Sequence, residues 1–283
     1  MSNHKQRVVV NSVTTKFVDI DRGVSQGTVL VPVLFSIMVN DSNVVNLETN
    51  LLIKFADDIT LSNPIGPNLP DDSLVCEIQN IRLWSSMNRM KLNLTKTWKL
   101  VMRGKTPKTP SRTVPAIERK SELKMGVTFH ENLCKWDTHS HYMMDKANSR
   151  LYILRICKYY RYTLEELTIL FHKLIVSVFT YAIEVWACGY CGKHLSKIDK
   201  FCKRAWKYGY SKECMFISDV IQIRDKQLWK KITATHTCSL TDLLANQPTY
   251  QSLRQCGDDY MLPRIRTGCF KSCFANRSLF TFI

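Results

Sequence analysis

Apolar and polar residues alternate over two stretches near the start of the chain, and this alternation predicts strands. Residues 7–20 are rich in Val and alternate weakly, which predicts two short strands or a hairpin. In residues 51–61 the alternation runs up to an acidic pair, Asp57 and Asp58, and resumes after it. This pattern predicts a hairpin with the two carboxylates at or beside its tip.

Helical spacing follows this hairpin. Residues 74–90 carry apolar side chains every three or four positions, which predicts a helix for which Asp72 is a candidate N-cap. Residues 92–102 alternate again as in a strand, and residues 123–129 predict a further short strand with a glycine inside it. The front of the chain therefore mixes strands with helices.

After about residue 130 the helical period dominates. It predicts helices over residues 143–160, 195–208 and 217–233. Thr163 and Glu166 have the spacing of a capping box, which predicts that another helix opens there.

These patterns predict an α+β fold. An antiparallel sheet with helices is expected over residues 1–130, an all-helical region over 131–250 and a basic C-terminal tail over 251–283.

The charge is uneven along the chain. The 283 residues carry a formal net charge of +16, but residues 1–61 sum to −1 and residues 62–283 to +17. Such a balance favours a polyanionic partner, nucleic acid above all, bound through its phosphates. Five cations recur at helical spacing and have Trp206 and Tyr208 beside them for stacking on bases; a solvated helix face is the alternative interpretation. They are Lys197, Lys200, Lys203, Arg204 and Lys207.

The apolar segments predict neither export nor a membrane span. Residues 1–11 are polar and lack the apolar run of a signal peptide. The most apolar run, residues 167–187, contains His172, Lys173 and Glu184. We therefore expect an intracellular protein, nuclear or cytoplasmic, with no membrane partner.

Eleven cysteines, an odd number with scattered spacing, favour reduced thiols over a disulfide framework. Cys188, Cys191, His194 and Cys202 include ligand types that zinc prefers, although their spacing matches no standard zinc knuckle. The alternative is that most cysteines are small core residues.

The acidic pair is the main candidate for chemistry. Adjacent carboxylates raise each other's pKa unless a cation neutralises them, and Mg²⁺ is the cation of phosphate chemistry. The alternative is a solvated turn, because Asp is a common turn residue.

The order of the motifs supports the chemical interpretation. A glycine-bracketed loop at residues 22–28 precedes an apolar stretch, then Phe55-Ala56-Asp57-Asp58, a helix, and a segment with Asn93, Lys96 and Thr97. This order resembles the palm of reverse transcriptases, specifically those of non-LTR (LINE-type) retrotransposons. The helical rear half resembles the thumb of the same family.

The resemblance implies an RNA-directed DNA polymerase that uses an RNA template, a DNA primer, dNTPs and two Mg²⁺ ions, with no small organic cofactor. Asp57 would bind metal directly with Asp58 in support, and Lys96 would neutralise or protonate the pyrophosphate; a solvated lysine is the alternative for Lys96. The residues expected along template and nucleotide are Arg22, Gln26, Gly27 and Phe55, and those of the primer grip are Gly126 and Val127.

One part of the family pattern is missing from this sequence. The family has a further catalytic Asp well before the glutamine–glycine loop, whereas only 25 residues precede Gln26. Asp19 and Asp21 abut the loop and match its variable lead-in. We therefore expect an N-terminally truncated reverse transcriptase that does not polymerise alone. The alternative is a catalytically dead nucleic-acid-binding remnant.

Overall fold

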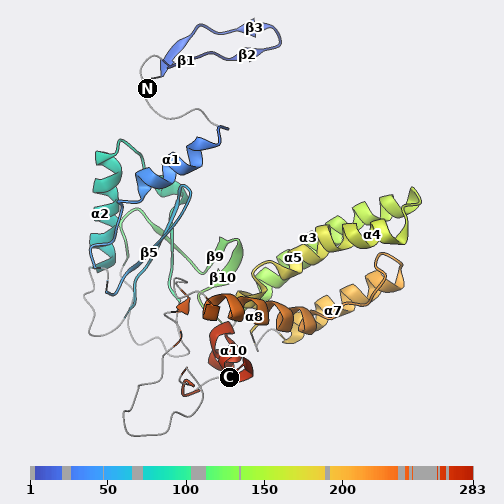
Figure 1. Ribbon diagram of the computed structural model, residues 1–283. Coiled ribbons are helices and arrows are strands. Elements are labelled where there is room, and N and C mark those ends of the chain that lie inside the picture. Colours follow the sequence, from blue (N-terminus) through green and yellow to red (C-terminus); the bar gives the residue numbers. More distant parts are fainter. Residues whose placement is uncertain are drawn as a thin grey trace. The chain divides into compact units, whose positions relative to one another are not determined.

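The structure is a computed structural model that describes residues 4–20, 27–46, 48–65, 73–102, 113–133, 135–188, 192–234, 240–241, 244, 260, 262–265 and 268–282. It is a mixed α+β fold in two compact units (Figure 1). Unit 1 comprises Met1–Thr97 and Lys108–Glu118, and unit 2 comprises Trp98–Pro107 and Arg119–Ile283. The expected α+β class is confirmed. The expected palm and thumb remain predictions, and the described strands pair only two by two.

The N-terminal segment is an antiparallel hairpin, as its alternation predicted. Strand β1 (His4–Gln6) pairs with β4 (Val18–Ile20), and β2 (Val9–Val10) pairs with β3 (Val13–Thr14). Asn11 and Ser12 form the turn with positive φ values of 46° and 68°. Two left-handed residues match the right-handed twist of the flanking strands in a two-residue turn.

The central part of unit 1 is a second hairpin with two helices. Helix α1 (Leu30–Val39) precedes β5 (Leu51–Phe55), which pairs in antiparallel register with β6 (Asp58–Ser62). Helix α2 (Ser73–Met87) follows and confirms the helical period predicted for this segment. The proposed cap, Asp72, lies outside the described residues.

A buried carboxylate connects these elements. Glu77 of α2 is 1% exposed, and its two carboxylate oxygens accept hydrogen bonds from the amides of Val45 and Asn46 and from Asn50 Nδ2, at 2.8, 3.0 and 2.7 Å. Asn63, just after β6, donates to Asn50 Oδ1 at 2.6 Å. Burial by itself raises the pKa of Glu77, but the three hydrogen bonds outweigh it and leave the pKa below its usual value.

The strand predicted over residues 92–102 is shorter than expected. Leu94–Lys96 forms a 3-10 turn, η1, and only Trp98–Leu100 is a strand, β7, which pairs with β8 (Glu118–Lys120). The cause is local, because Thr97 Oγ1 donates to the Asn93 carbonyl at 2.9 Å and Thr95 Oγ1 to Asn93 Oδ1 at 2.7 Å. Such side-chain bonds compete with a sheet ladder and favour a turn.

The single strand predicted over residues 123–129 is a hairpin instead. Strands β9 (Glu122–Met125) and β10 (Val127–His130) pair across Gly126, whose φ of +72° only glycine adopts readily. Val127 and Phe129 pack into the helical core of unit 2. This hairpin therefore belongs with the helices, and the two units do not divide at residue 130.

Unit 2 is built mainly from helices, close to the segments predicted. Helix α3 covers Asp137–Tyr159, and the Thr163–Glu166 capping box opens α4 (Leu164–Phe171). A π-helical turn, η2 (His172–Val176), joins α4 to α5 (Ser177–Thr180). The remaining helices of this part are α6 (Ile183–Trp186), α7 (Gly192–Lys207) and α8 (Ile217–Ala234). Their apolar faces bury Leu154, Phe171, Phe179 and Phe201 in one core.

Helices α3 and α7 are joined at both ends. At their N-terminal ends, Asp137 Oδ1 accepts from Lys193 Nζ at 2.7 Å. At their C-terminal ends, Lys158 Nζ donates to the Tyr208 carbonyl. Gly209, in the left-handed conformation with φ +67°, leaves room there, since a Cβ would lie 3.3 Å from Lys158 Nζ. The two helices therefore run in the same direction, side by side.

The segment expected as a basic C-terminal tail contains two helices, α9 (Gly268–Ser272) and α10 (Phe274–Phe282). Leu279 is buried against Trp229 and Ile232 of α8. Arg277 donates to both carboxylate oxygens of the buried Asp225, at 2.6 and 2.8 Å. A two-pronged pair of this kind fixes the orientation of α10 on α8.

Within the described part of the chain, no helix combines the length and the apolarity that crossing a membrane requires.

Replacing Glu77 with Gln tests the buried carboxylate. An amide offers one acceptor oxygen for three donors, so we expect Glu77→Gln to lower the free energy of unfolding by about 1–3 kcal/mol at pH 7. Because the folded-state pKa is lowered, the Glu77 contribution is complete above the unfolded value of 4.5 and is lost as the pH falls through the folded value. Urea unfolding followed by circular dichroism at pH 7 and pH 3 measures both effects. Glu48→Gln, an exposed position, is the matched control; an equal loss in both variants would contradict the role of Glu77.

Candidate functional site

The acidic pair lies at the tip of the β5–β6 hairpin, as predicted. Phe55 is paired with Asp58, so Ala56 and Asp57 form a two-residue turn. Ala56 has a φ of +50°, at a position that such turns usually give to glycine. This left-handed conformation costs an alanine about 1–2 kcal/mol. Asp57 and Asp58 are exposed, and neither carboxylate makes a hydrogen bond or ion pair with any residue the structure describes.

Lys54 fixes this hairpin to the preceding helix. Its Nζ donates to the carbonyls of Val39 and Asn40 at the C-terminal end of α1, at 2.9 and 3.0 Å. These carbonyls have no partner within the helix, and a cation there also complements the helix dipole. The position of the carboxylates relative to α1 therefore depends on a lysine inside an apolar strand.

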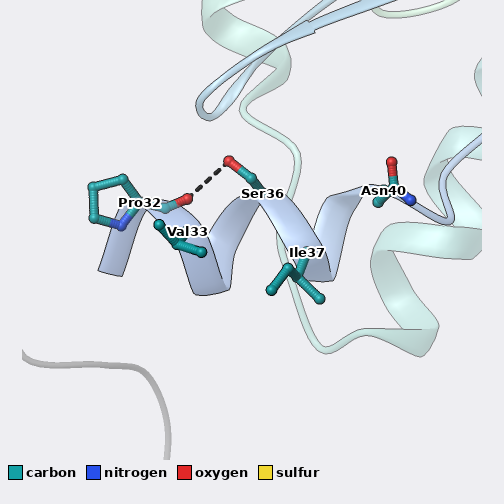
Figure 2. A pocket seen from close by; sticks show the side chains of 5 residues that line it. All are labelled: Pro32, Val33, Ser36, Ile37 and Asn40. Atoms are coloured by element: carbon teal, nitrogen blue, oxygen red, sulfur yellow. Dashed lines mark hydrogen bonds between the residues drawn. The ribbon is translucent and has the colours of Figure 1, made fainter. Parts of the chain in front are cut away.

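Helix α1 itself follows the glycine loop and is largely exposed. Gly27 has a φ of +85°, and Pro32 stands in the first turn of α1, where its missing amide costs nothing. Figure 2 shows a shallow hollow along this helix, where Ser36 Oγ donates to the Pro32 carbonyl at 2.8 Å. Apart from Ser36 and Asn40 the hollow is apolar, and it offers no cation for a phosphate.

The other residues expected around the acidic pair are only partly brought to it. Phe55 is adjacent and 81% exposed. Lys96 ends the 3-10 turn, is exposed, and forms no ion pair with Asp57 or Asp58. Arg22 and Gln26 lie outside the described residues.

The carboxylates supply only part of a two-metal site. Mg²⁺ is usually held by one or two carboxylates together with substrate phosphates, and a pair of ions needs further support. Among the described residues, Asp57 and Asp58 have no third His, Cys, Asp or Glu grouped with them. The described side chains therefore fit one weakly held ion and do not by themselves complete a two-metal centre.

The second candidate site is a basic groove in unit 2, and all five predicted cations line it. Together with Met144 of α3, the residues of the basic groove are Lys197, Lys200, Lys203, Arg204 and Lys207. The opposite face of α7 buries Ile198, Phe201 and Ala205, which orients the cations toward solvent. Like charges this close repel one another, so the groove favours a polyanion that neutralises them.

The predicted primer-grip residues lie in the β9–β10 hairpin. Val127 is 3% exposed and belongs to the core, so its side chain is not available to a ligand. Gly126 lies under the ring of Tyr181, where a Cβ would be 2.5 Å from the Tyr181 hydroxyl. The Thr128 amide donates to His139 Nδ1 at 3.3 Å and so attaches the hairpin to α3.

His139, with Cys134 and His141 a weaker candidate for zinc in the sequence, is a structural histidine. It is 3% exposed, with the rings of Trp136 and Trp186 at 6.2 and 5.9 Å. Burial, with a smaller effect of the Lys124 charge, lowers the pKa of His139 to about 4. The ring is therefore neutral near pH 7, as its acceptance of the Thr128 amide requires.

The possible zinc set is not assembled by the described residues. No group of three potential ligands occurs among them, and Cys191 lies outside them. Burial, together with the nearby charge of Asp199, raises the pKa of Cys202 to about 12. Zinc binds the thiolate, so this cysteine is better explained as a core residue.

Three residues that shape these sites were missed from the sequence, although each left a signal there. Lys54 interrupts an apolar strand, and Glu77 falls four residues before Ile81 on the apolar face of its helix. A charge on a buried face generally has fixed partners. For Met144 the only signal in the sequence is its position in the helical period of α3.

Comparison with known proteins gives no match: no family model, no curated protein and no solved structure matches this chain.

Replacing Gly126 tests the hairpin beside Tyr181. We expect Gly126→Ala to destabilise unit 2 by about 1–2 kcal/mol, because the left-handed φ is strained for any residue with a Cβ. Gly126→Asn should lower the stability less than Gly126→Ala, since Asn tolerates a left-handed conformation better. Thermal unfolding of the full chain measures the difference. Tyr181 is exposed and can move aside, so adding Tyr181→Ala to Gly126→Ala should restore little of the lost stability. Full recovery of stability would show that the clash with the ring matters more than the strained backbone.

Proposed function

We propose that this chain is a reverse-transcriptase-like protein whose helical unit binds nucleic acid through its phosphates, and that by itself it does not extend a primer. The observation that carries the proposal is the basic groove. A polymerase of this family requires both a carboxylate centre and a surface for the nucleic acid backbone, and among the described residues the surface is the more complete of the two.

The dimensions of the basic groove suit a nucleic acid strand. Ten residues separate Lys197 from Lys207, which is about 15 Å along a helix. One strand of a duplex places a phosphate every 3.4 Å, so the five cations are able to meet about four phosphates. Contacts of this kind are independent of sequence and depend strongly on salt.

The motif order supports descent from the reverse transcriptases of non-LTR retrotransposons. The glycine-bracketed segment 22–28 of the sequence precedes helix α1 and the hairpin that carries Asp57 and Asp58, and helix α2 and the β9–β10 hairpin follow. RNA template, DNA primer, dNTPs and Mg²⁺ are the ligands that this descent implies.

The metal ligands that the described residues offer do not support polymerisation. In-line nucleotidyl transfer needs two metal ions that hold the attacking and leaving oxygens. Two exposed carboxylates without a third donor among the described residues do not hold both ions. We therefore derive no catalytic step from the described residues, and we propose that the chain alone binds nucleic acid without catalysis.

Charge reversal in the basic groove tests the binding function. We expect Lys200→Glu with Lys203→Glu to weaken binding of a fluorescein-labelled single-stranded RNA at least tenfold, measured by fluorescence anisotropy. The slope of log K against log salt should become shallower by about 1.4, since two of the phosphate contacts are lost at about 0.7 each. Lys230→Glu with Lys231→Glu makes the same charge change on the exposed face of α8 and is the control. Equal losses in the two pairs would mean that net charge alone drives binding.

Primer extension tests the carboxylates. With a labelled DNA primer on an RNA template, dNTPs and Mg²⁺ or Mn²⁺, we expect no extension product from the isolated chain. Asp57→Ala should leave binding of the primer–template unchanged or slightly tighter, because it removes a negative charge. Incorporation by the natural chain that Asp57→Ala abolishes would overturn the inactive assignment.

A further inference from the structure

The C-terminal ends of α3 and α7 carry exposed aromatic side chains that the basic groove does not use. Tyr159, Tyr160 and Tyr162 are 81%, 70% and 47% exposed at the end of α3, and Tyr208 is 65% exposed after the end of α7. We call these four residues the tyrosine tip. Large side chains that are exposed singly are normal on a protein surface, whereas a cluster of them marks an interaction surface.

The tyrosine tip has a fixed shape. Lys158 donates to the Tyr208 carbonyl and lies 5.3 Å from the Tyr210 ring, so it connects the two helix ends. The rings of Tyr159 and Tyr160 are 5.4 Å apart, edge to face. The capping box at Thr163 fixes the turn that follows them. Figure 1 shows both helices ending on the same side of unit 2.

The charge around the tip favours a polyanion. Residues 155–166 contain three Lys or Arg and two Glu, and residues 203–213 contain four and one. Two of these carboxylates are engaged locally: Glu165 with Lys212 and Glu166 with the N-cap of α4. Arg155, Arg161 and Lys207 are exposed beside the rings.

The basic groove leads to the tip. Lys207, the last cation of the groove, is the residue before Tyr208. We propose that the tyrosine tip stacks on unpaired bases of a strand whose phosphates lie in the basic groove, so that the chain prefers single-stranded to double-stranded nucleic acid. Phosphates in a charged groove together with bases on aromatic rings are how single strands are bound without sequence preference. The inference rests on the proposed nucleic-acid binding and specifies its ligand.

The experiment separates bases from phosphates. Fluorescence anisotropy of the full chain is measured with labelled 20-nucleotide oligo-U, oligo-dT, an abasic strand of the same length and a 20-base-pair duplex. We expect Tyr159→Ala with Tyr160→Ala to weaken binding of both base-bearing single strands about tenfold or more, because the stacking contacts between these rings and the bases are lost. Binding of the abasic strand and of the duplex should change little.

Three controls make the result specific. Tyr159→Phe with Tyr160→Phe keeps the rings and should keep the affinity. Tyr152→Ala removes a tyrosine that is 63% exposed, about 10 Å before the tip on α3, and should have little effect on binding. Circular dichroism checks that the exposed substitutions leave the helices intact.

Several outcomes would overturn the inference. An unchanged affinity for oligo-U, or an equal loss on the abasic strand, would exclude stacking while leaving phosphate binding in the groove. The natural chain could instead sediment with phosphatidylcholine–phosphatidylserine vesicles while the Tyr159→Ala, Tyr160→Ala variant does not. If RNA binding is the same in both, the tip would be assigned to a membrane surface. Failure of the natural chain to bind any of the strands would instead overturn the proposed function itself.

Discussion

The pairing of α3 with α7 is the constraint on which the candidate nucleic-acid surface depends. Asp137 joins their N-terminal ends to Lys193, and Lys158 joins their C-terminal ends to the Tyr208 carbonyl. Between these two polar contacts the apolar faces of both helices enter one core. The cationic side chains of α7 therefore point into solvent. They lie beside α3 and not along an isolated helix. Sliding one helix along the other would separate the basic groove from the tyrosine tip.

Unit 1 depends on a different kind of contact. It buries few apolar side chains, and the Glu77 carboxylate instead collects donors from the loop between α1 and β5. Lys54 makes the second polar connection, to the end of α1. Glu77 holds the base of the hairpin through Asn50, and Lys54 holds it near its tip, where the carboxylates are exposed and Ala56 is strained. Strain of this kind at a tip persists only when the surrounding structure maintains it.

Much of the local structure was predictable, and the failures have local or tertiary causes. The hairpin bearing Asp57 followed from alternation, and the capping box at Thr163 from its residue types, since both are properties of neighbouring positions. The strand expected over residues 92–102 was shortened by Asn93 and the threonines, which satisfy the backbone within a turn. The hairpin at Gly126 joined the helical unit because Val127 and Phe129 needed the apolar cover that the helices supply.

The sequence by itself determined the first two hairpins and the long helices, the concentration of positive charge after residue 61 and the positions of the acidic pair. These depend on the period and the type of residues close together in the chain. The tertiary structure decided that Met144 lines the groove of α7, that Glu77 is a buried acceptor and that His139 is neutral between two tryptophans. It also decided that two helix ends share one aromatic tip. Each of these outcomes requires residues far apart in the chain to pack together, and periodicity within one segment does not specify its partner.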